Sequence, residues 1–434
     1  MLPTIQLRTR HAFFALLVQM AGVGAGYLVH VALARWMGAA AYGSYAYAMA
    51  WIGLLSIATA FGLPVSSVRF VSQYIATGKP ALLRGTVTRF RQIVIVGGSI
   101  AAACGTAAAL LLRGIPSWFI IAVWLVPLSS FVTLNTEMAR GIGRPMLSQV
   151  PDKVLRSLAT VAAAAWFYRT AGALTLDQAM LAGLLAALAV AVLQVVLLGR
   201  ALAPMMSGAA AAEYHTGEWI RVAGSLLAVS LFVLLLGQVD LLVAGFFLEP
   251  AQIGIYSAAI RVSSLIGFVP LSVTIVTSPQ IAALYSQRDA VGLQELAAHI
   301  AHLSFWPSLA LTAGVLALAS PILSIFGPEF VAARWPLYIL AASQLFKAGM
   351  GAVGYFLDMT GHQAYNARAF AVTTVAGIVL NLVLIPRFGI TGAAWANFLS
   401  WLIVMLWLHR EVATRVGVRA SVVFAMQRPP AADN

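Results

Sequence analysis

The chain has 434 residues, of which 61% are hydrophobic and only 9% are charged. Because soluble domains carry about 25% charged residues, this composition excludes a soluble globular protein and indicates an integral membrane protein. The 26 Lys and Arg residues outnumber the 13 Asp and Glu residues. In a membrane protein this excess indicates loops that face anionic lipid rather than a nucleic-acid partner.

Runs of about 20 mainly apolar residues predict the membrane-spanning helices. The first run, 12–34, follows Arg8 and Arg10 and is long enough to span the bilayer, so we interpret it as a helix rather than a cleaved signal peptide. Twelve such runs occur, at 12–34, 45–67, 92–112, 117–138, 155–171, 178–198, 222–246, 253–284, 300–325, 336–359, 369–386 and 391–408. We therefore expect an all-α polytopic membrane protein with about 12 transmembrane helices.

Basic residues are distributed unequally over the two sides of these helices. Of the 26 Lys and Arg residues, 19 fall on the side of the N-terminus, five on the opposite side and two within spans. Because cytoplasmic loops carry the excess of Lys and Arg, both termini are predicted to be cytoplasmic.

Two pairs of segments indicate an internal repeat. The run GAAAYGSYAYA resembles the later run LEPAQIGIYSAA, which aligns Tyr45 with Tyr256, and a second echo matches Glu137 with Asp358. Because six helices per half return the chain to its starting side, we predict two parallel six-helix bundles related by a pseudo-two-fold axis along the membrane normal. The predicted boundaries are 1–210 and 211–410 for the bundles and 411–434 for a basic, disordered cytoplasmic tail.

Two opposite charges lie inside predicted spans on either side of one short turn. Asp240 lies about ten residues before the turn and Arg261 about ten after it, so an antiparallel helix pair would place both at one depth. Charged residues inside a membrane are costly and mark a transport pathway by default. Two interpretations stay open: a structural ion pair that locks the hairpin, or a pair that lines a solvated cavity.

Other cations also lie within or beside predicted spans. Lys347 is eleven residues into its span, and Gln344 and Gly351 share its helix face at i−3 and i+4. Arg69 stands at the inner end of the second span and Arg35 at the outer end of the first. Such cations suit a substrate with phosphate groups, because guanidinium binds phosphate oxygens bidentately. For Arg35 and Arg69 the alternative is snorkelling to the interface.

Several segments carry a resemblance to a known family. In chain order they are ARWMGAAAYGSYAYAMA, FGLPVSSVRFVSQY, Asp240, Gly254-Ile255-Tyr256, Ala259-Ile260-Arg261, FGPEFVAARWPLYIL and NLVLIPRFGITGAAWANF. Their order and spacing over essentially the whole chain resemble the polysaccharide-export members of the MOP flippase superfamily, the Wzx-type transporters of lipid-linked O-antigen or capsule units. The related lipid II flippases usually carry two additional helices, and multidrug exporters of the superfamily accept cations, which these basic residues fit poorly.

The resemblance implies a flippase of the bacterial inner membrane and not an enzyme. It would move a polyprenyl-diphosphate-linked oligosaccharide from the cytoplasmic to the periplasmic leaflet by alternating access, for surface polysaccharide biosynthesis. The alternative is another MOP-type transporter, either a lipid II flippase or a multidrug or cation antiporter. The implied partners are the glycan lipid, membrane lipids, a polysaccharide polymerase and a chain-length regulator, without nucleic acid.

The same residues define a candidate site without catalytic or metal-binding groups. The predicted contacts of the anionic head group are Arg261, Lys347, Arg69, Arg35 and Gln344. No phosphate-binding GxxxxGK[ST] motif occurs, so we expect no ATP and no bound cofactor. Transport would be driven by the membrane potential or by H⁺ or Na⁺, and the candidate ion-coupling carboxylates are Asp240, Glu137 and Asp358.

Overall fold

The computed structural model describes residues 2–112, 115–207 and 211–426, with side chains from residue 17 onward apart from 228 and 229. Arg113, Arg428 and the end of the predicted tail, 427–434, lie outside the described residues, as do the side chains of Arg8 and Arg10. All regular structure in the described part is helical, and eight of its helices are long and apolar enough to cross a membrane. The expectation of an all-α, multi-pass membrane protein is therefore confirmed.

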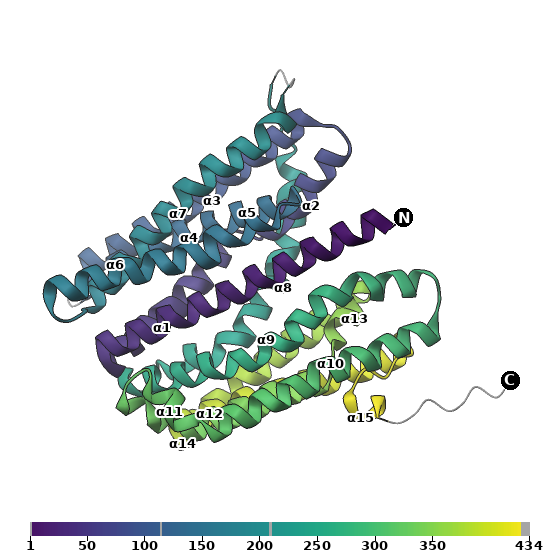
Figure 1. Ribbon diagram of the computed structural model, residues 1–434. Coiled ribbons are helices and arrows are strands. Elements are labelled where there is room, and N and C mark those ends of the chain that lie inside the picture. The colour runs from purple at the N-terminus through teal and green to yellow at the C-terminus, as the bar shows by residue number, and fades with distance from the viewer. Residues whose placement is uncertain (1, 113–114, 208–210, 427–434) are drawn as a thin grey trace. The chain divides into compact units, whose positions relative to one another are not determined.

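The chain divides into two compact units, residues 1–234 and 235–434, which we call unit 1 and unit 2. In unit 1, α4 packs against α1, α2, α3 and α7 (Figure 1). A core of large side chains from α2, α3 and α8 includes Phe70, Phe90 and Trp219, all fully buried. The helices of unit 1 are α1 (Leu2–Thr59), α2 (Leu63–Ala76), α3 (Pro80–Leu111), α4 (Ser117–Gly141), α5 (Pro145–Gln149), the π-helix η1 (Val150–Leu155), α6 (Arg156–Ala171), α7 (Leu176–Met206) and the first part of α8 (Thr216–Ala244).

Two glycines break the helical path at the start of unit 1. Gly38 has a φ of 76° and divides α1 into two parts, which correspond to the predicted spans 12–34 and 45–67. The second predicted span ends early, because the backbone breaks at Phe61 and Gly62 before α2 begins. A Cβ at Gly62 would collide with the carbonyl oxygen of Ala223 in α8, so only glycine allows this close approach.

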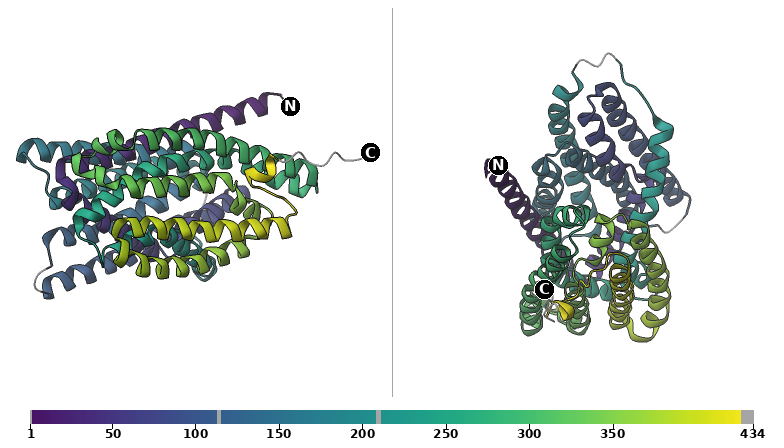
Figure 2. Two further views of the ribbon diagram at one scale, coloured as in Figure 1. Left: turned by 90° about the horizontal axis from the view of Figure 1, so that it is seen from below. Right: turned by 90° about the vertical axis from the view of Figure 1, so that its right-hand side faces the viewer.

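Unit 2 contains the end of α8 and all later helices. Here α9 packs against α10 and α12, and α12 also packs against α14; these helices run alongside one another in both views (Figure 2). The helices are α9 (Pro250–Ser286), α10 (Ala290–Ala317), α11 (Ala319–Ser324), the 3₁₀ helix η2 (Pro328–Ala333), α12 (Arg334–Gly349), α13 (Val353–Met359), α14 (Gln363–Arg415) and α15 (Val422–Ala425). Gly389, with a φ of 58°, divides α14 as Gly38 divides α1.

The predicted span 336–359 is broken in the structure. Its first part, α12, ends at Gly349, and Gly351 has a φ of 70° in the break before α13. The spacing alone predicted that Gly351 shares a helix face with Lys347. This prediction is wrong, because the helix ends between the two residues. The C-terminal segment approaches this break closely, because a Cβ at Gly351 would collide with the carbonyl oxygen of Ala420.

The C-terminal segment is ordered as far as the structure describes it, which corrects the expectation of a disordered tail. Helix α14 continues to Arg415, and Val418, Ala420 and Val422 are buried against the core of unit 2. The side chain of Gln294 in α10 forms two hydrogen bonds with the backbone of Arg419, of 2.9 and 3.1 Å. The apolar spacing Val418-Ala420-Val422 explains why this part packs although the whole segment is basic.

Candidate functional site

The main cavity that we describe lies within unit 1 and has a volume of about 910 Å³. The second part of α1, the beginning of α2, α4, α6 and α8 contribute its wall, which is mainly apolar. Serine and threonine hydroxyls interrupt this wall at several points. Its charged lining residues are Arg69, Glu137, Arg140 and Arg156, so the cavity carries three guanidinium groups and one carboxylate.

Arg69 reaches this cavity because of the break before α2. Pro64, in the first turn of α2, favours a helix start there, and the buried Phe70 anchors the helix in the core. The side chain of Arg69 is exposed to the cavity, 5.8 Å from the ring centroid of Phe70. In the part of the chain that the structure describes, no acceptor forms a hydrogen bond or ion pair with Arg69. Its guanidinium is therefore available to a ligand.

The other charged groups of the cavity are held by neighbours. Arg140 Nη1 lies 2.9 Å from Glu137 Oε2, one helical turn away on α4. Arg156 Nη1 lies 3.2 Å from Asp152 Oδ1, and its Nη2 donates a hydrogen bond of 3.3 Å to the hydroxyl of Ser129. Because guanidinium has five N–H donors, these bonds orient each arginine and leave donors for a ligand.

The π-helix η1 places Asp152 and Lys153 beside this charged cluster. Pro151 removes one backbone donor, which accounts for a local departure from α-helical hydrogen bonding. The Lys153 ammonium donates to Gln19 Oε1 in α1 at 2.8 Å, so η1 is tied to the first helix. Burial lowers the pKa of Lys153, and the nearby carboxylates Asp152 and Glu137 oppose that shift.

The cavity brings together only some of the predicted site residues. Arg69 and Glu137 line it, whereas Arg35 is exposed on α1 and is not among its lining residues. Sequence reasoning missed Arg140 and Arg156, which it counted as loop cations on the inner side. The E-x-x-R spacing of Glu137 and Arg140 on a helix was a usable signal for the first. The i, i+4 spacing of Asp152 and Arg156 was a usable signal for the second, although only folding brings Arg156 to Ser129.

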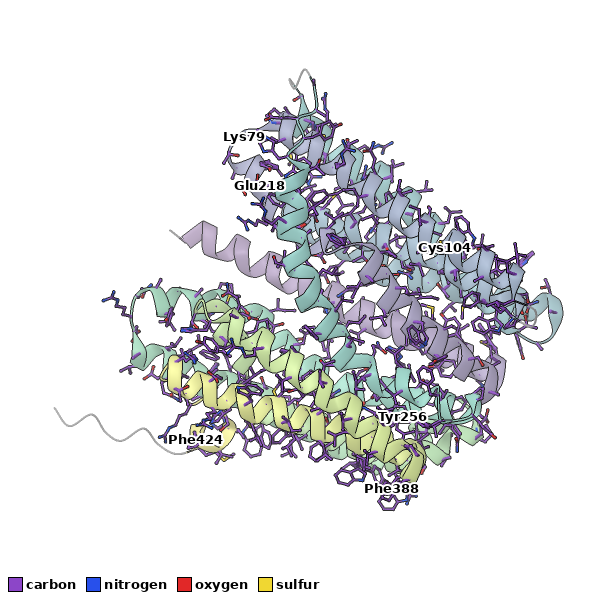
Figure 3. The ribbon with its side chains drawn as sticks, turned by 180° about the vertical axis from the view of Figure 1, so that it is seen from behind. Lys79, Cys104, Glu218, Tyr256, Phe388 and Phe424 are labelled. Atoms are coloured by element: carbon purple, nitrogen blue, oxygen red, sulfur yellow. The ribbon has the colours of Figure 1, made fainter. Side chains whose placement is uncertain are left out.

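In unit 2, Asp240 is buried, with 1% of its surface exposed, and has polar partners. Its carboxylate accepts hydrogen bonds from the Tyr256 hydroxyl at 2.6 Å, the Asn397 amide at 3.0 Å and the Leu241 backbone N–H at 2.9 Å. Figure 3 shows Tyr256 at the same end of unit 2 as Phe388. Three donors from three helices make this a satisfied buried acid.

Asp240 and Arg261 do not form the ion pair that their spacing suggested. Tyr256, nearer the turn, occupies the position opposite Asp240. Arg261 follows five residues later, about 7.5 Å along α9 and about 140° around its axis, so its side chain leaves from another side of the helix. Equal depth in the membrane was therefore not sufficient to bring the two charges together.

Lys347 lies in the last turn of α12, where the helix dipole favours a cation. Its ammonium is 4.1 Å from the ring centroid of Trp401, and Asp240 is the carboxylate that interacts with it electrostatically. Gln344 faces Gly267 of α9, where a Cβ would lie 2.8 Å from the Gln344 Oε1 atom. Asp358 is exposed on α13 and accepts a hydrogen bond of 2.9 Å from Asn366.

The fold defines the class of protein, an all-helical multi-pass membrane protein. The chain shares its fold with the lipid II flippase MurJ in an inward closed conformation (TM-score 0.71, 15% identity, covering 92% of this chain and 87% of that one). It also shares it with an inward-facing multidrug resistance MATE transporter of the MOP superfamily (TM-score 0.68, 16% identity, covering 92% and 95%). At 15% and 16% identity, these likenesses establish a shared fold.

The family follows from the sequence match. A family model described as polysaccharide biosynthesis protein matches residues 9–285, more than half of the chain, and a second, MatE, matches residues 226–383. The chain belongs to the polysaccharide biosynthesis protein family, and the resemblance inferred from its motifs is confirmed.

One curated relative is the probable low-salt glycan biosynthesis flippase Agl15 of Haloferax volcanii. It is 29% identical over 167 residues, which cover 37% of this chain and 34% of that protein. The chain thus spans about a third of the length of the curated relatives it matches, and this relative is archaeal.

Proposed function

We propose that the protein moves a polyprenyl-diphosphate-linked oligosaccharide from the cytoplasmic to the outer leaflet by alternating access, for surface polysaccharide biosynthesis. The observation that carries this proposal is the cavity of unit 1, with three arginines, one glutamate and an apolar wall. Membership of the polysaccharide biosynthesis family and a relative named as a glycan biosynthesis flippase support it.

The composition of the cavity matches the three parts of such a substrate. Arg69, Arg140 and Arg156 would bind the diphosphate oxygens, because charge-assisted bidentate bonds are the strongest available to phosphate. The serine and threonine hydroxyls of the wall suit the first sugar, and the apolar residues suit the adjoining isoprenoid units. A volume of about 910 Å³ accommodates this head region but not a long glycan, which would have to extend beyond the cavity.

Other transporters of the same superfamily are the alternatives. A lipid II flippase would carry a diphosphate lipid too, and the fold shared with MurJ favours it equally. A multidrug or cation antiporter fits less well, because the single carboxylate of the cavity, Glu137, is already paired with Arg140. Uptake of a radiolabelled short-chain diphosphate lipid into proteoliposomes, measured against lipid II and an organic cation, would separate the three.

The driving force can be the membrane potential or a coupling ion. Outward movement of two negative charges gains about 2.3 kcal/mol per charge per 100 mV, which is several kcal/mol in total. H⁺ or Na⁺ exchange through Asp240 is the other candidate. A proton or cation that binds its buried carboxylate would replace the hydrogen bonds from Tyr256 and Asn397. Glu137 and Asp358 stay as weaker candidates, because each is outside this buried cluster.

In the cell, we place the protein in the bacterial inner membrane with both termini in the cytoplasm. Twelve spans in two six-helix bundles result if α1 and α14 each contribute two, divided at Gly38 and Gly389, and if the shorter helices α6 and α12 also cross the membrane. A polysaccharide polymerase and a chain-length regulator would use the exported units.

Deletion of the gene should cause lipid-linked oligosaccharide to accumulate on the cytoplasmic side, and an unchanged amount would contradict the proposed function.

Cysteine labelling tests this topology. With Cys104 replaced, cysteines at the exposed positions Thr77, Met146 and Gln287 should stay protected from an impermeant thiol reagent in intact cells. Cysteines at the exposed positions Ala40 and Pro328 should react. All five should react after permeabilisation, which is the control for accessibility. Labelling of the first three in intact cells would invert or refute the proposed orientation.

Lys347 provides a test of whether unit 2 also contacts the anionic head group. Lys347→Ala should reduce export while the amount of protein in the membrane stays normal, because the ammonium contacts only a ring face and Asp240 keeps its three hydrogen-bond donors without it. Lys347→Arg should preserve part of the activity. Export by Lys347→Ala at the wild-type level would remove Lys347 from the site.

A further inference from the structure

A second hollow in unit 1, a groove between α3 and α7 of about 430 Å³, has no role in the function proposed above. Helices α3 and α7 both pack closely on α4 and only loosely on each other, which leaves the groove between them. Its polar lining comes from Arg84, Thr88 and Arg91 on α3 and from Ser207 after the end of α7. None of the described residues that line it is acidic, so the groove carries two positive charges.

Both arginines are held in place by protein acceptors. Arg84 Nη2 donates to the carbonyl oxygen of Met206 at 3.1 Å, which joins the start of α3 to the end of α7. Arg91 Nε and Nη2 donate to Asn135 Oδ1 on α4, at 3.0 and 2.8 Å. These bonds fix the guanidinium positions, so little side-chain entropy is lost when an anion binds. Arg91 forms no ion pair with a carboxylate of the described residues, so its charge is not neutralised within the protein.

The groove continues into two stripes of exposed aliphatic side chains. On α3 the spacing Arg84, Thr88, Arg91, Ile95 places a polar stripe and then an exposed isoleucine on one helix face. On α7 the corresponding stripe runs from Met206 back through Ala203 and Gly199 to Val196 and Val192, and both valines are exposed. A ligand that follows both stripes has an anionic head and apolar chains.

The position of the groove along α3 and α7 agrees with a ligand that has an anionic head and apolar chains. Figure 3 shows Lys79, just before α3, and Glu218, in the first turn of α8, at one end of unit 1, with Cys104 of α3 towards the other end. The first turns of α3, which follow Lys79, also carry the basic residues Arg84, Arg89 and Arg91. Clusters of this kind beside spans attract anionic lipids at a membrane surface.

We infer that the α3–α7 groove binds an anionic glycerophospholipid, with its phosphate at Arg84, Thr88 and Arg91 and an acyl chain along the aliphatic stripes. This site is separate from the cavity that contains Arg69 and would be occupied whatever the transported substrate is. The bound lipid would fill the gap between α3 and α7 and thereby stabilise unit 1.

Native mass spectrometry of the full-length protein tests this. After mixing with equal amounts of phosphatidylglycerol and phosphatidylcholine, the wild-type protein should retain phosphatidylglycerol preferentially. Arg84→Gln should weaken that binding about tenfold, as expected for the loss of one charge-assisted hydrogen bond. Gly199→Leu should weaken it as well without changing any charge, because a Cβ at Gly199 meets only open space and a longer side chain would enter the groove.

The matched control is Arg200→Gln, which removes an exposed arginine of α7 that does not line the groove. It should bind phosphatidylglycerol like the wild-type protein. Equal weakening by Arg200→Gln would reduce the effect to general charge attraction and overturn the assigned site. Displacement of the lipid by millimolar inorganic phosphate would show a free-anion site instead. If Arg84→Gln unfolds, as a thermal melt in neutral detergent would reveal, Gly199→Leu carries the test, and undiminished binding by that variant contradicts the proposal.

Discussion

Arg69→Ala is expected to reduce transport roughly 10- to 100-fold while the protein folds and inserts normally. The reduction corresponds to the loss of one charge-assisted hydrogen bond of about 1.5–3 kcal/mol to the substrate phosphate. Stability should not change, because no protein acceptor among the described residues pairs with this guanidinium. The measurement is the initial rate of flipping in proteoliposomes or the amount of surface glycan in a complemented deletion strain, with membrane protein quantified in parallel.

The effect should be specific to the cavity. Arg200→Ala, which removes an exposed arginine of the same unit outside the cavity, is the control and should transport normally. Arg69→Lys should retain part of the rate, since it keeps the charge and loses bidentate geometry. The double variant Arg69→Ala with Arg156→Ala should fall further than either single variant. A wild-type rate for Arg69→Ala would exclude this cavity as the phosphate site.

Asp240→Ala is expected to destabilise the protein strongly. Without the carboxylate, the buried hydroxyl of Tyr256 and the amide of Asn397 lose their acceptor, and each unsatisfied group costs about 1–3 kcal/mol. Asp240→Asn keeps one acceptor oxygen and should be destabilised less, but it cannot exchange a proton or bind a cation. Thermal melts of the purified variants, together with transport under an imposed pH or Na⁺ gradient, separate the structural from the coupling role.

A double variant that combines Asp240→Ala with Arg261→Ala tests whether these two residues form an ion pair. If the two residues formed an ion pair, Arg261→Ala would restore the stability of Asp240→Ala. Because Tyr256 and Asn397 are the actual partners, the double variant should be no more stable than Asp240→Ala alone. Tyr256→Phe is the matched control and should lose only one hydrogen bond, with about 1 kcal/mol of stability. Rescue of Asp240→Ala by Arg261→Ala would contradict the observed network.

Much of the architecture was accessible from the sequence, because a bilayer imposes simple demands on a chain. Backbone polar groups in hydrocarbon must be satisfied within helices, so apolar run length alone predicts them. The helix breaks were harder to predict. At Gly62 and Gly351 the chain departs from the predicted spans because backbone from α8 or from the C-terminal segment lies against the glycine. Such long-range contacts leave no periodic signal.

For the candidate site, too, the sequence predicts some features and only the tertiary structure shows the others. The sequence by itself determined the class and family, and it predicted Arg69, Glu137 and Asp240 as site residues, because charge is rare enough to stand out within or beside apolar spans. Only the tertiary structure decided which of these charges meet. It placed Arg156 beside Ser129 and Asp240 beside Tyr256 and Asn397, since contacts between helices depend on rotation about each helix axis and not on depth alone.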